Sequence, residues 1–391
     1  MFRTLSIAWA QLLHQKVQTI VTILGIAFTA ALLFMQIGFR IGLLESSTQL
    51  PASFQSDIIL TSNSSIAFSV AVPFSERRLN QVLAFEEVEA ITPIYITMIF
   101  VKRLEAQPKF MSSMQVIAFP LKPNIIDLPG LSENIEKLKG DNLFLLDGRS
   151  RSELSTLITA IKNDGRVNTE ITTLGFERRK VDFVGLFEMG ASTFYNGNLI
   201  TSEANFLKTF GLGKGEIVAG LVHVKPGADV PSLISRMKAY LPDDIKVMSK
   251  EELIREDKRF IEFSSPMGTV FLFAMLFSII IGIVILYQVL YQNISRFTKE
   301  YATLKAIGYS QGFLVKIVLE QVFIFAISGY IPGFITSCFV YNVLSEVTKM
   351  KFLMSFNIAA FVLFQICFIC VVSGVIATNK LKEANPVDVF N

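Results

Sequence analysis

The chain has 391 residues, of which 51% are hydrophobic and 18% charged, and its formal net charge is +3. Segment 40–266 holds 26 Lys/Arg and 28 Asp/Glu, whereas the other 164 residues hold ten Lys/Arg and five Asp/Glu. The sequence is therefore the sum of a membrane part and a water-soluble part, which excludes a purely cytosolic enzyme, a secreted disulfide scaffold and a disordered chain. So balanced a charge also gives no reason to expect nucleic-acid binding.

Four apolar runs are long enough to cross a bilayer core of ~30 Å, which takes ~20 helical residues. They lie at 20–38, 267–291, 315–343 and 356–378. Four spans place both termini on the same side of the membrane. The Lys/Arg content of the short loops does not decide which side this is.

Segment 40–266 is predicted to be one large α+β domain. Strands are expected at 91–103, 110–119, 178–187, 216–224 and 245–248, and helices at 79–88, at 230–240 and from Ser249 onward. Ser249 and Glu252 form a capping box at the start of the last helix. The strand–helix–strand–helix order at the end of the domain predicts a split βαβ unit of the ferredoxin-like kind. The last helix is expected to run almost directly into the second span and to act as a stiff lever.

Reactive side chains are scarce. The three cysteines, Cys338, Cys367 and Cys370, all lie in apolar runs, so the domain must be held together by its core. Cys367 and Cys370 have a CxxC spacing, but the apolar setting favours small buried residues over a redox or zinc site. Two histidines and no phosphate-binding loop leave us expecting no catalytic residue, no metal site and no cofactor bound by this chain.

The segment between the second and third spans is predicted to form an amphipathic helix. Phe297, Tyr301, Leu304 and Ile307 fall on one helical face, and Gly308 is placed to end the helix. One interpretation is a helix that lies on lipid headgroups. The other is a short helix that docks in a groove of a soluble partner.

Residues 299–310, KEYATLKAIGYS, resemble the E-x-A-x-L-K-A-I-G loop of the FtsX-like permease superfamily, which includes MacB-type ABC transporter permeases. The tail at 379–390, NKLKEANPVDVF, is similar to the K-x-x-P-x-x-A-L ending of that family, with Val389 where alanine is usual. The stretches 34–40 (FMQIGFR) and 184–202 resemble the cyanobacterial DevC-type exporter permeases.

The resemblance implies an α-helical protein of the inner membrane, with four transmembrane helices and a periplasmic α+β domain at 40–266 that has porter-like, ferredoxin-like βαβ elements. Loop 344–355 would then be periplasmic. The amphipathic segment 1–19, loop 292–314 and tail 379–391 would be cytoplasmic. In the family the loop at 292–314 is the coupling helix that grips the ATPase. Carried over to this chain, the coupling residues are Arg296, Lys299, Glu300, Thr303, Leu304, Lys305, Ala306, Ile307 and Gly308.

The implied partners are a separate ABC ATPase (DevA-like) that binds ATP and Mg²⁺, a membrane-fusion adaptor (DevB-like), a TolC-like outer-membrane channel and a second copy of the chain. The implied function is to transmit ATP-driven movement to the periplasm and so export a lipid or another amphiphile, a glycolipid in the best-known branch. Two alternatives stay open: a non-transporting regulatory scaffold of the FtsX type, and a lipoprotein-release permease.

Three further residues lie in the third span. Glu320 is an acidic residue inside a membrane segment, and we interpret it as a structural polar anchor near the coupling helix rather than a proton relay. Gly329 and Gly333 form a small-xxx-small pattern that allows close helix packing, either within one chain or between two copies.

Overall fold

The computed structural model describes residues 16–102, 111–192, 194–211, 215–350 and 352–378. The segment before residue 16 and the tail at 379–391 lie outside these residues, so the predictions made for them concern parts that the structure does not describe.

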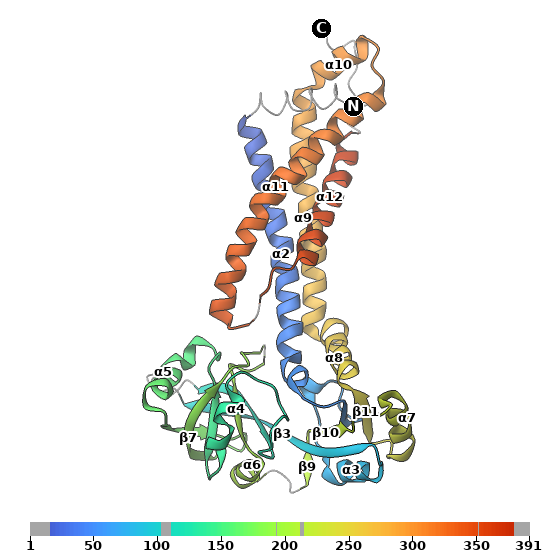
Figure 1. Cartoon of the computed structure of the whole chain (residues 1–391). Helices are drawn as coiled ribbons and strands as arrows, with labels where there is room; N and C mark the ends of the chain where they lie inside the picture. Colours follow the sequence, from blue (N-terminus) through green and yellow to red (C-terminus); the bar gives the residue numbers. More distant parts are fainter. Residues whose placement is uncertain (1–15, 103–110, 193, 212–214, 351, 379–391) are drawn as a thin grey trace. The chain divides into compact units, whose positions relative to one another are not determined.

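The chain divides into two compact units, and Figure 1 gives the element labels used below. A helical unit contains the residues up to Ile41, 268–343 and the residues from 352 onward. A mixed α/β unit contains 42–267 together with 344–351.

Long apolar helices build the helical unit. They are α2 (Lys16–Ser53), α9 (Pro266–Arg296), α11 (Gln311–Thr348) and α12 (Phe356–Thr378), and the short α10 (Thr298–Ala306) lies between α9 and α11. All but α10 are long and apolar enough to cross a membrane. Even α12, with 23 residues, is about 35 Å long at 1.5 Å per residue. Each long helix contains one of the predicted spans, so the prediction of four apolar helices is confirmed.

The first sheet of the α/β unit is ferredoxin-like. Four antiparallel strands lie in the order β11 (Ile245–Ser249), β1 (Ile58–Ser62), β10 (Ala219–Val224), β3 (Val88–Lys102). Helix α3 (Glu76–Gln81) follows β1, and α7 (Val230–Tyr240) joins β10 to β11. This is the split βαβ order, and it confirms the unit predicted from the end of the domain.

A second group of strands is inserted between β3 and β10. It runs from the far end of β3 in the order β4 (Met111–Phe119), β8 (Asn198–Ser202), β5 (Leu143–Asp147), β7 (Arg178–Phe187), β6 (Val167–Thr172). Strand β6 then pairs back with β3, Val101 opposite Ile171, so these strands close into a barrel. Closure removes the exposed edges that such a sheet would otherwise present.

The remaining elements are short. They are β2 (Phe74–Ser75), β9 (Glu216–Ile217), α4 (Leu131–Asn134), α5 (Ser155–Asp164), α6 (Glu203–Phe210), α8 (Lys250–Arg259) and several 3₁₀ turns, among them η1 (Phe68–Val70).

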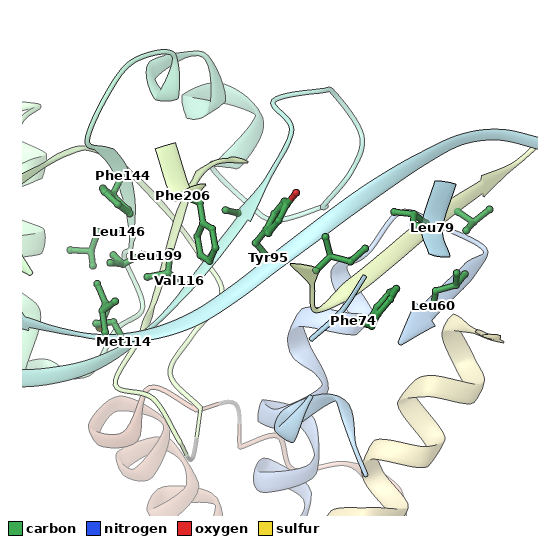
Figure 2. Packing of buried hydrophobic residues seen from close by; sticks show 14 of the residues in the cluster. Leu60, Phe74, Leu79, Tyr95, Met114, Val116, Phe144, Leu146, Leu199 and Phe206 are labelled. Carbon is green, nitrogen blue, oxygen red and sulfur yellow. The ribbon is translucent and has the colours of Figure 1, made fainter. Parts of the chain in front are cut away.

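One apolar core runs through both groups of strands. Figure 2 shows Leu60, Phe74 and Leu79 on the ferredoxin-like side of β3 and the barrel residues on the other. Tyr95 of β3 lies between them, 3% exposed, with its ring 5.5 Å from that of Phe206. The long strand β3 therefore joins the two groups of strands through this one core.

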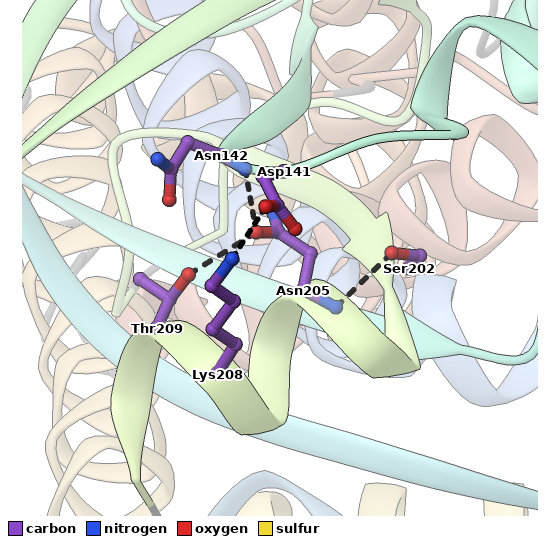
Figure 3. Close-up of polar contacts among 6 residues, drawn as sticks. All are labelled: Asp141, Asn142, Ser202, Asn205, Lys208 and Thr209. Carbon is purple, nitrogen blue, oxygen red and sulfur yellow. Dashed lines mark hydrogen bonds and ion pairs between the residues drawn. The ribbon is translucent and has the colours of Figure 1, made fainter.

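Helix α6 is fixed to the barrel by one buried amide, which Figure 3 shows. The side chain of Asn205 accepts a hydrogen bond from the backbone amide of Asn142 at 2.7 Å and donates one to the hydroxyl of Thr201 at 2.6 Å. The hydroxyl of Ser202 caps the helix by accepting from the amide of Asn205. Because Asn205 is 2% exposed, these bonds offset the cost of burying its amide.

The predicted stiff lever is wrong. The capping box is present, with the Ser249 hydroxyl accepting from the Glu252 amide at 3.1 Å. However, α8 passes into a π-helical turn at Phe260–Ser264, which ends where the amide of Ser265 donates to the carbonyl of Phe260. Ser265 is extended (φ −85°, ψ 150°), because the ring of Pro266 disfavours helical backbone in the residue before it. The helical hydrogen-bond ladder is therefore interrupted before α9 begins.

Candidate functional site

The candidate coupling helix α10 has two sharp ends. Phe297 interrupts the backbone between α9 and α10 with φ −88° and ψ 11°. At the other end the Tyr309 amide donates to the carbonyl of Leu304, and the Gly308 amide donates to that of Lys305, both at 3.1 Å. This pair of bonds is a Schellman motif, and Gly308 adopts the φ of +103° that the motif favours in glycine. Gly308 therefore lies where the sequence placed it.

One face of α10 is covered by the helical unit. Phe297 is 8% exposed, Tyr301 0% and Ala302 1%, and the Phe297 and Tyr301 rings meet edge to face at 6.5 Å. They belong to the same buried cluster as Ile294 of α9 and Leu314 of α11. The helix is therefore held between the two long helices that it connects.

The other face of α10 is open. Its exposed residues are Lys299, Glu300, Thr303, Ala306 and Ile307, with Arg296 exposed at the end of α9 and Leu304 and Lys305 half-buried. Ile307 is 71% exposed. The four apolar residues predicted to share one face are thus divided: Phe297 and Tyr301 pack inward, while Ile307 lies among the charged side chains. The open face offers apolar and mostly basic contacts.

Glu320 lies on α11, half-buried and next to Gln321, which is 3% exposed. It lies about two turns after the buried Leu314, which belongs to the cluster against which α10 packs.

Gly329 and Gly333 of α11 lie against α2 of the same chain. A Cβ at Gly329 would stand 2.5 Å from the Ile26 Cβ, and one at Gly333 would stand 2.7 Å from the Ala30 Cβ. Two turns further on, Tyr341 covers Gly38, and its hydroxyl donates to the carbonyl of Phe34. Small residues therefore let α2 and α11 approach each other closely along about three turns.

Two buried carboxylates of the α/β unit were not singled out from the sequence. Asp147 is 0% exposed and accepts hydrogen bonds from the amides of Arg149, Met189 and Gly190 and from the Asn198 side chain. Burial raises its pKa, and these bonds oppose the rise. Asp147 thereby fixes the loop that follows β7.

Asp257 of α8 is also 0% exposed, but it has fewer partners. Its Oδ1 accepts from the amide and the hydroxyl of Ser69, both at 3.3 Å, and its Oδ2 forms no hydrogen bond of good geometry with the described residues, although the backbone amide of Phe68 also lowers the pKa of this carboxyl. Burial raises the pKa of Asp257 to about 6. Its neighbours in a small cavity include Lys246 and Glu256.

Within the described residues, no three His, Cys, Asp or Glu side chains gather as a metal site would require. The exposed groups of α10 likewise include no nucleophile–base pair.

A family comparison covers this part of the chain. Residues 272–386 match the model described as the FtsX-like permease C-terminal domain. The C-terminal helical region is therefore similar to an FtsX-like permease domain. It includes every candidate coupling residue, together with Glu320, Gly329 and Gly333.

No curated protein matches the chain. Among solved structures, the periplasmic region of MacB from Actinobacillus actinomycetemcomitans is 12% identical, with a TM-score of 0.34, over 55% of this chain and 96% of that one. The extracellular domain of YknZ, a noncanonic ABC-type transporter from Gram-positive bacteria, is 9% identical, with a TM-score of 0.31, over 49% of this chain and 99% of that one. A domain of a putative permease from Porphyromonas gingivalis is 12% identical, with a TM-score of 0.29, over 51% of this chain and 91% of that one. The assignment of the permease domain rests on the family match.

Proposed function

We propose that the chain is the membrane-embedded permease subunit of an ABC-type transporter and that α10 couples it to a separate ATPase. The observation that carries this proposal is the exposed face of α10 within the FtsX-like domain. The helix is fixed by Phe297 and Tyr301 on one side and capped by Gly308, so a push on its open face is passed to α9 and α11. ATP and Mg²⁺ would be bound by the partner, and this chain would bind no cofactor.

The four long helices are proposed to cross the inner membrane. Residues 344–351, which begin in the last turns of α11 and continue toward α12, belong to the same compact unit as 42–267, which runs from the second part of α2 to the start of α9. Two segments of one unit must lie on one side of a bilayer, and alternate crossings put α10 and both termini on the other. With the coupling helix in the cytoplasm, the α/β unit would be periplasmic.

The division between the units falls inside α2 and inside α11, and a third connection runs through α9. Of the connections through α2 and α9, α2 is the better candidate for transmitting force. It is helical without interruption from Lys16 to Ser53, and the division between the units falls inside it. The connection through α9 has to pass the extended Ser265. A continuous hydrogen-bonded helix resists bending, whereas an extended residue between two helices is free to act as a joint. We therefore assign transmission to α2 and the adjustment of angle to residues 260–265.

The system proposed around this chain is tripartite. A second copy, a periplasmic adaptor and an outer-membrane channel would complete it, and the cargo would be a lipid or another amphiphile. The α/β unit would then receive the movement and pass it to the adaptor. A regulatory scaffold would share the coupling helix but would need no adaptor.

Crosslinking tests the coupling surface. In full-length chain lacking Cys338, Cys367 and Cys370, Thr303→Cys or Ile307→Cys should crosslink to the ATPase in membranes. Ala302→Cys, one residue away but 1% exposed, is the matched control and should not. Equal crosslinking at 302 and 303, or none at 303 and 307, would contradict the assignment of this face.

A second measurement separates the transporter from the scaffold. ATP hydrolysis should change the accessibility of cysteines placed in 42–267, and a periplasmic adaptor should co-purify with the detergent-solubilised chain. An accessibility change with cell-wall hydrolase activation and no adaptor would favour the scaffold.

A further inference from the structure

A shallow cleft in the α/β unit has no charged side chain in its lining. Its ten lining residues come from four stretches of sequence that hold no Asp, Glu, Lys or Arg: 46–56, 58–75, 110–121 and 189–202. All ten lie within 42–267, so the cleft belongs to the α/β unit alone. Because segment 40–266 as a whole carries 26 Lys/Arg and 28 Asp/Glu, this neutrality is a local property of the cleft.

The cleft offers both donors and acceptors of hydrogen bonds. The hydroxyl of Tyr195 and the side-chain amide of Gln115 form no hydrogen bond with any residue that the structure describes. The hydroxyl of Ser47 donates to a carbonyl of its own helix at 2.8 Å, which leaves its oxygen able to accept. The oxygen of Ser192 accepts from the amides of Phe194 and Tyr195 at 3.2 and 3.1 Å, which leaves its own hydrogen to be donated. A ligand can therefore both donate and accept here.

The walls of the cleft are fixed by the two buried carboxylates. Ser69 of the lining donates from its amide and its hydroxyl to Asp257, both at 3.3 Å. Met189, on the opposite segment of the lining, donates from its amide to Asp147 at 3.1 Å. The cleft is therefore formed before a ligand arrives, which lowers the entropy that binding would cost.

The cleft is small and open at its mouth. Its enclosed part measures about 30 Å³, which is room for about two water-sized groups, and the space including the mouth is about 390 Å³. Phe194 belongs to the lining and is 46% exposed. Only one edge of a ligand can enter the enclosed part, and the rest of the ligand would lie in the mouth against this aromatic ring.

We propose that this cleft binds a neutral saccharide by one edge of its sugar ring. Sugar hydroxyls both donate and accept hydrogen bonds, and the C–H face of the ring is apolar enough to pack on Phe194. A charged ligand would lose its water without gaining an opposite charge. A protein partner suits the cleft less well, because a stable protein interface buries more than about 1,000 Å². The site shares no residue with α10, so the coupling proposed for that helix does not depend on it.

Tryptophan fluorescence tests the site in the full chain. The chain carries one tryptophan, Trp9, so Phe194→Trp in a Trp9→Phe background places a single aromatic reporter in the cleft. With the chain in phosphatidylcholine nanodiscs, methyl β-D-glucoside should change the emission of this reporter in a saturable way. Glucuronate and glucosamine, which carry a negative and a positive charge on the same ring, should bind at least about tenfold more weakly.

Two substitutions in the cleft and one outside it make the result decisive. Tyr195→Phe and Gln115→Leu each remove hydrogen-bonding groups and keep most of the side chain, so each should weaken binding roughly three- to tenfold. Tyr240→Phe on α7, where the tyrosine is 59% exposed and outside the cleft, should leave binding unchanged. The inference is overturned by the absence of a saturable change at 194, by equal binding of glucuronate, or by equal losses at 195 and 240. An emission change that requires an added protein and no saccharide also overturns it.

Discussion

Replacing Asp257 by asparagine should remove a pH-dependent penalty from the contact between α8 and η1. The carboxyl is fully buried, and two long hydrogen bonds from Ser69 and the nearby backbone amide of Phe68 offset only part of the cost of burying its charge. Its pKa is raised from 3.8 to about 6, so the folded state binds the proton more tightly than the unfolded state does. The penalty is therefore complete above pH 6 and disappears as the pH falls toward 3.8.

The size of the effect follows from that displacement. At about 1.36 kcal/mol per pH unit, ionised Asp257 costs ~3 kcal/mol at neutral pH. As the pH falls from about 7.5 to 4.5, protonation of Asp257 removes ~2 kcal/mol of this penalty. The equilibrium constant for opening of the contact between α8 and η1 should then fall roughly thirtyfold. Lys246 and Glu256 line the same cavity, but both are present in the variant, so their contribution cancels in the comparison.

Hydrogen exchange in the full chain measures this directly. Protection of the amides in Phe68–Val70 and Lys250–Arg259, corrected for intrinsic exchange, should rise about thirtyfold more in the wild type than in Asp257→Asn on going from pH 7.5 to 4.5. Parallel pH profiles for the two proteins would refute the reasoning. So would a wild-type contact that loosens in acid relative to the variant.

Two more substitutions probe packing and buried polarity. Gly333→Ala should force α11 away from Ala30, 2.7 Å from the new methyl group, and lower the thermal stability of the solubilised chain by ~1–3 kcal/mol; Gly312→Ala, where the nearest atom is 3.9 Å away, should not. Asp147→Ala leaves four hydrogen-bond donors without their acceptor, so we expect a loss of ~3–5 kcal/mol and faster proteolysis of the loop around Gly190, with Asp147→Asn intermediate.

Local signals allowed several elements to be predicted closely. Helix α7 lies between a Lys-Pro-Gly turn and a Leu-Pro break, and its bounds agree with the predicted 230–240. The four spans were found because length and apolarity alone define them. The end of α10 could be predicted because it is a local feature. It requires a glycine that adopts the left-handed conformation, Gly308, and two backbone hydrogen bonds within the same turn.

The barrel could not be predicted in the same way. Strands β5 and β8 are five residues each and are buried at every position except the half-buried Leu143, so they lack the alternation that marks a half-buried strand. Their pairing is long-range: β8 lies beside β4, about 80 residues earlier in the chain. Closure through Val101 and Ile171 depends on the twist of the whole sheet, which no short stretch of sequence encodes.

The burial of single side chains was missed for a related reason. Asp257 stands in a helix where most residues are charged, and nothing in that run marks which of them turns inward. Phe297 and Ile307 share a helical stripe, but α9 and α11 cover the first and not the second. A periodic pattern shows on which face of its helix a side chain lies. Whether that face is covered depends on other helices, which the pattern does not describe.

The junction at Ser265 is a different case, because the decisive signal was in the sequence. Pro266 predicts a helix start, and the same ring disfavours helical backbone at the preceding residue. Taken together, the two effects require a break between α8 and α9 rather than one rod, and the extended Ser265 is that break. In α2, by contrast, Pro51 stands two residues before the end of the helix, so the hydrogen bond that its missing amide would donate is lost only there, and the helix is continuous up to that point. Pro266 therefore marks a connection that can bend, because the residue before it is extended, whereas Pro51 leaves α2 helical across the division between the units.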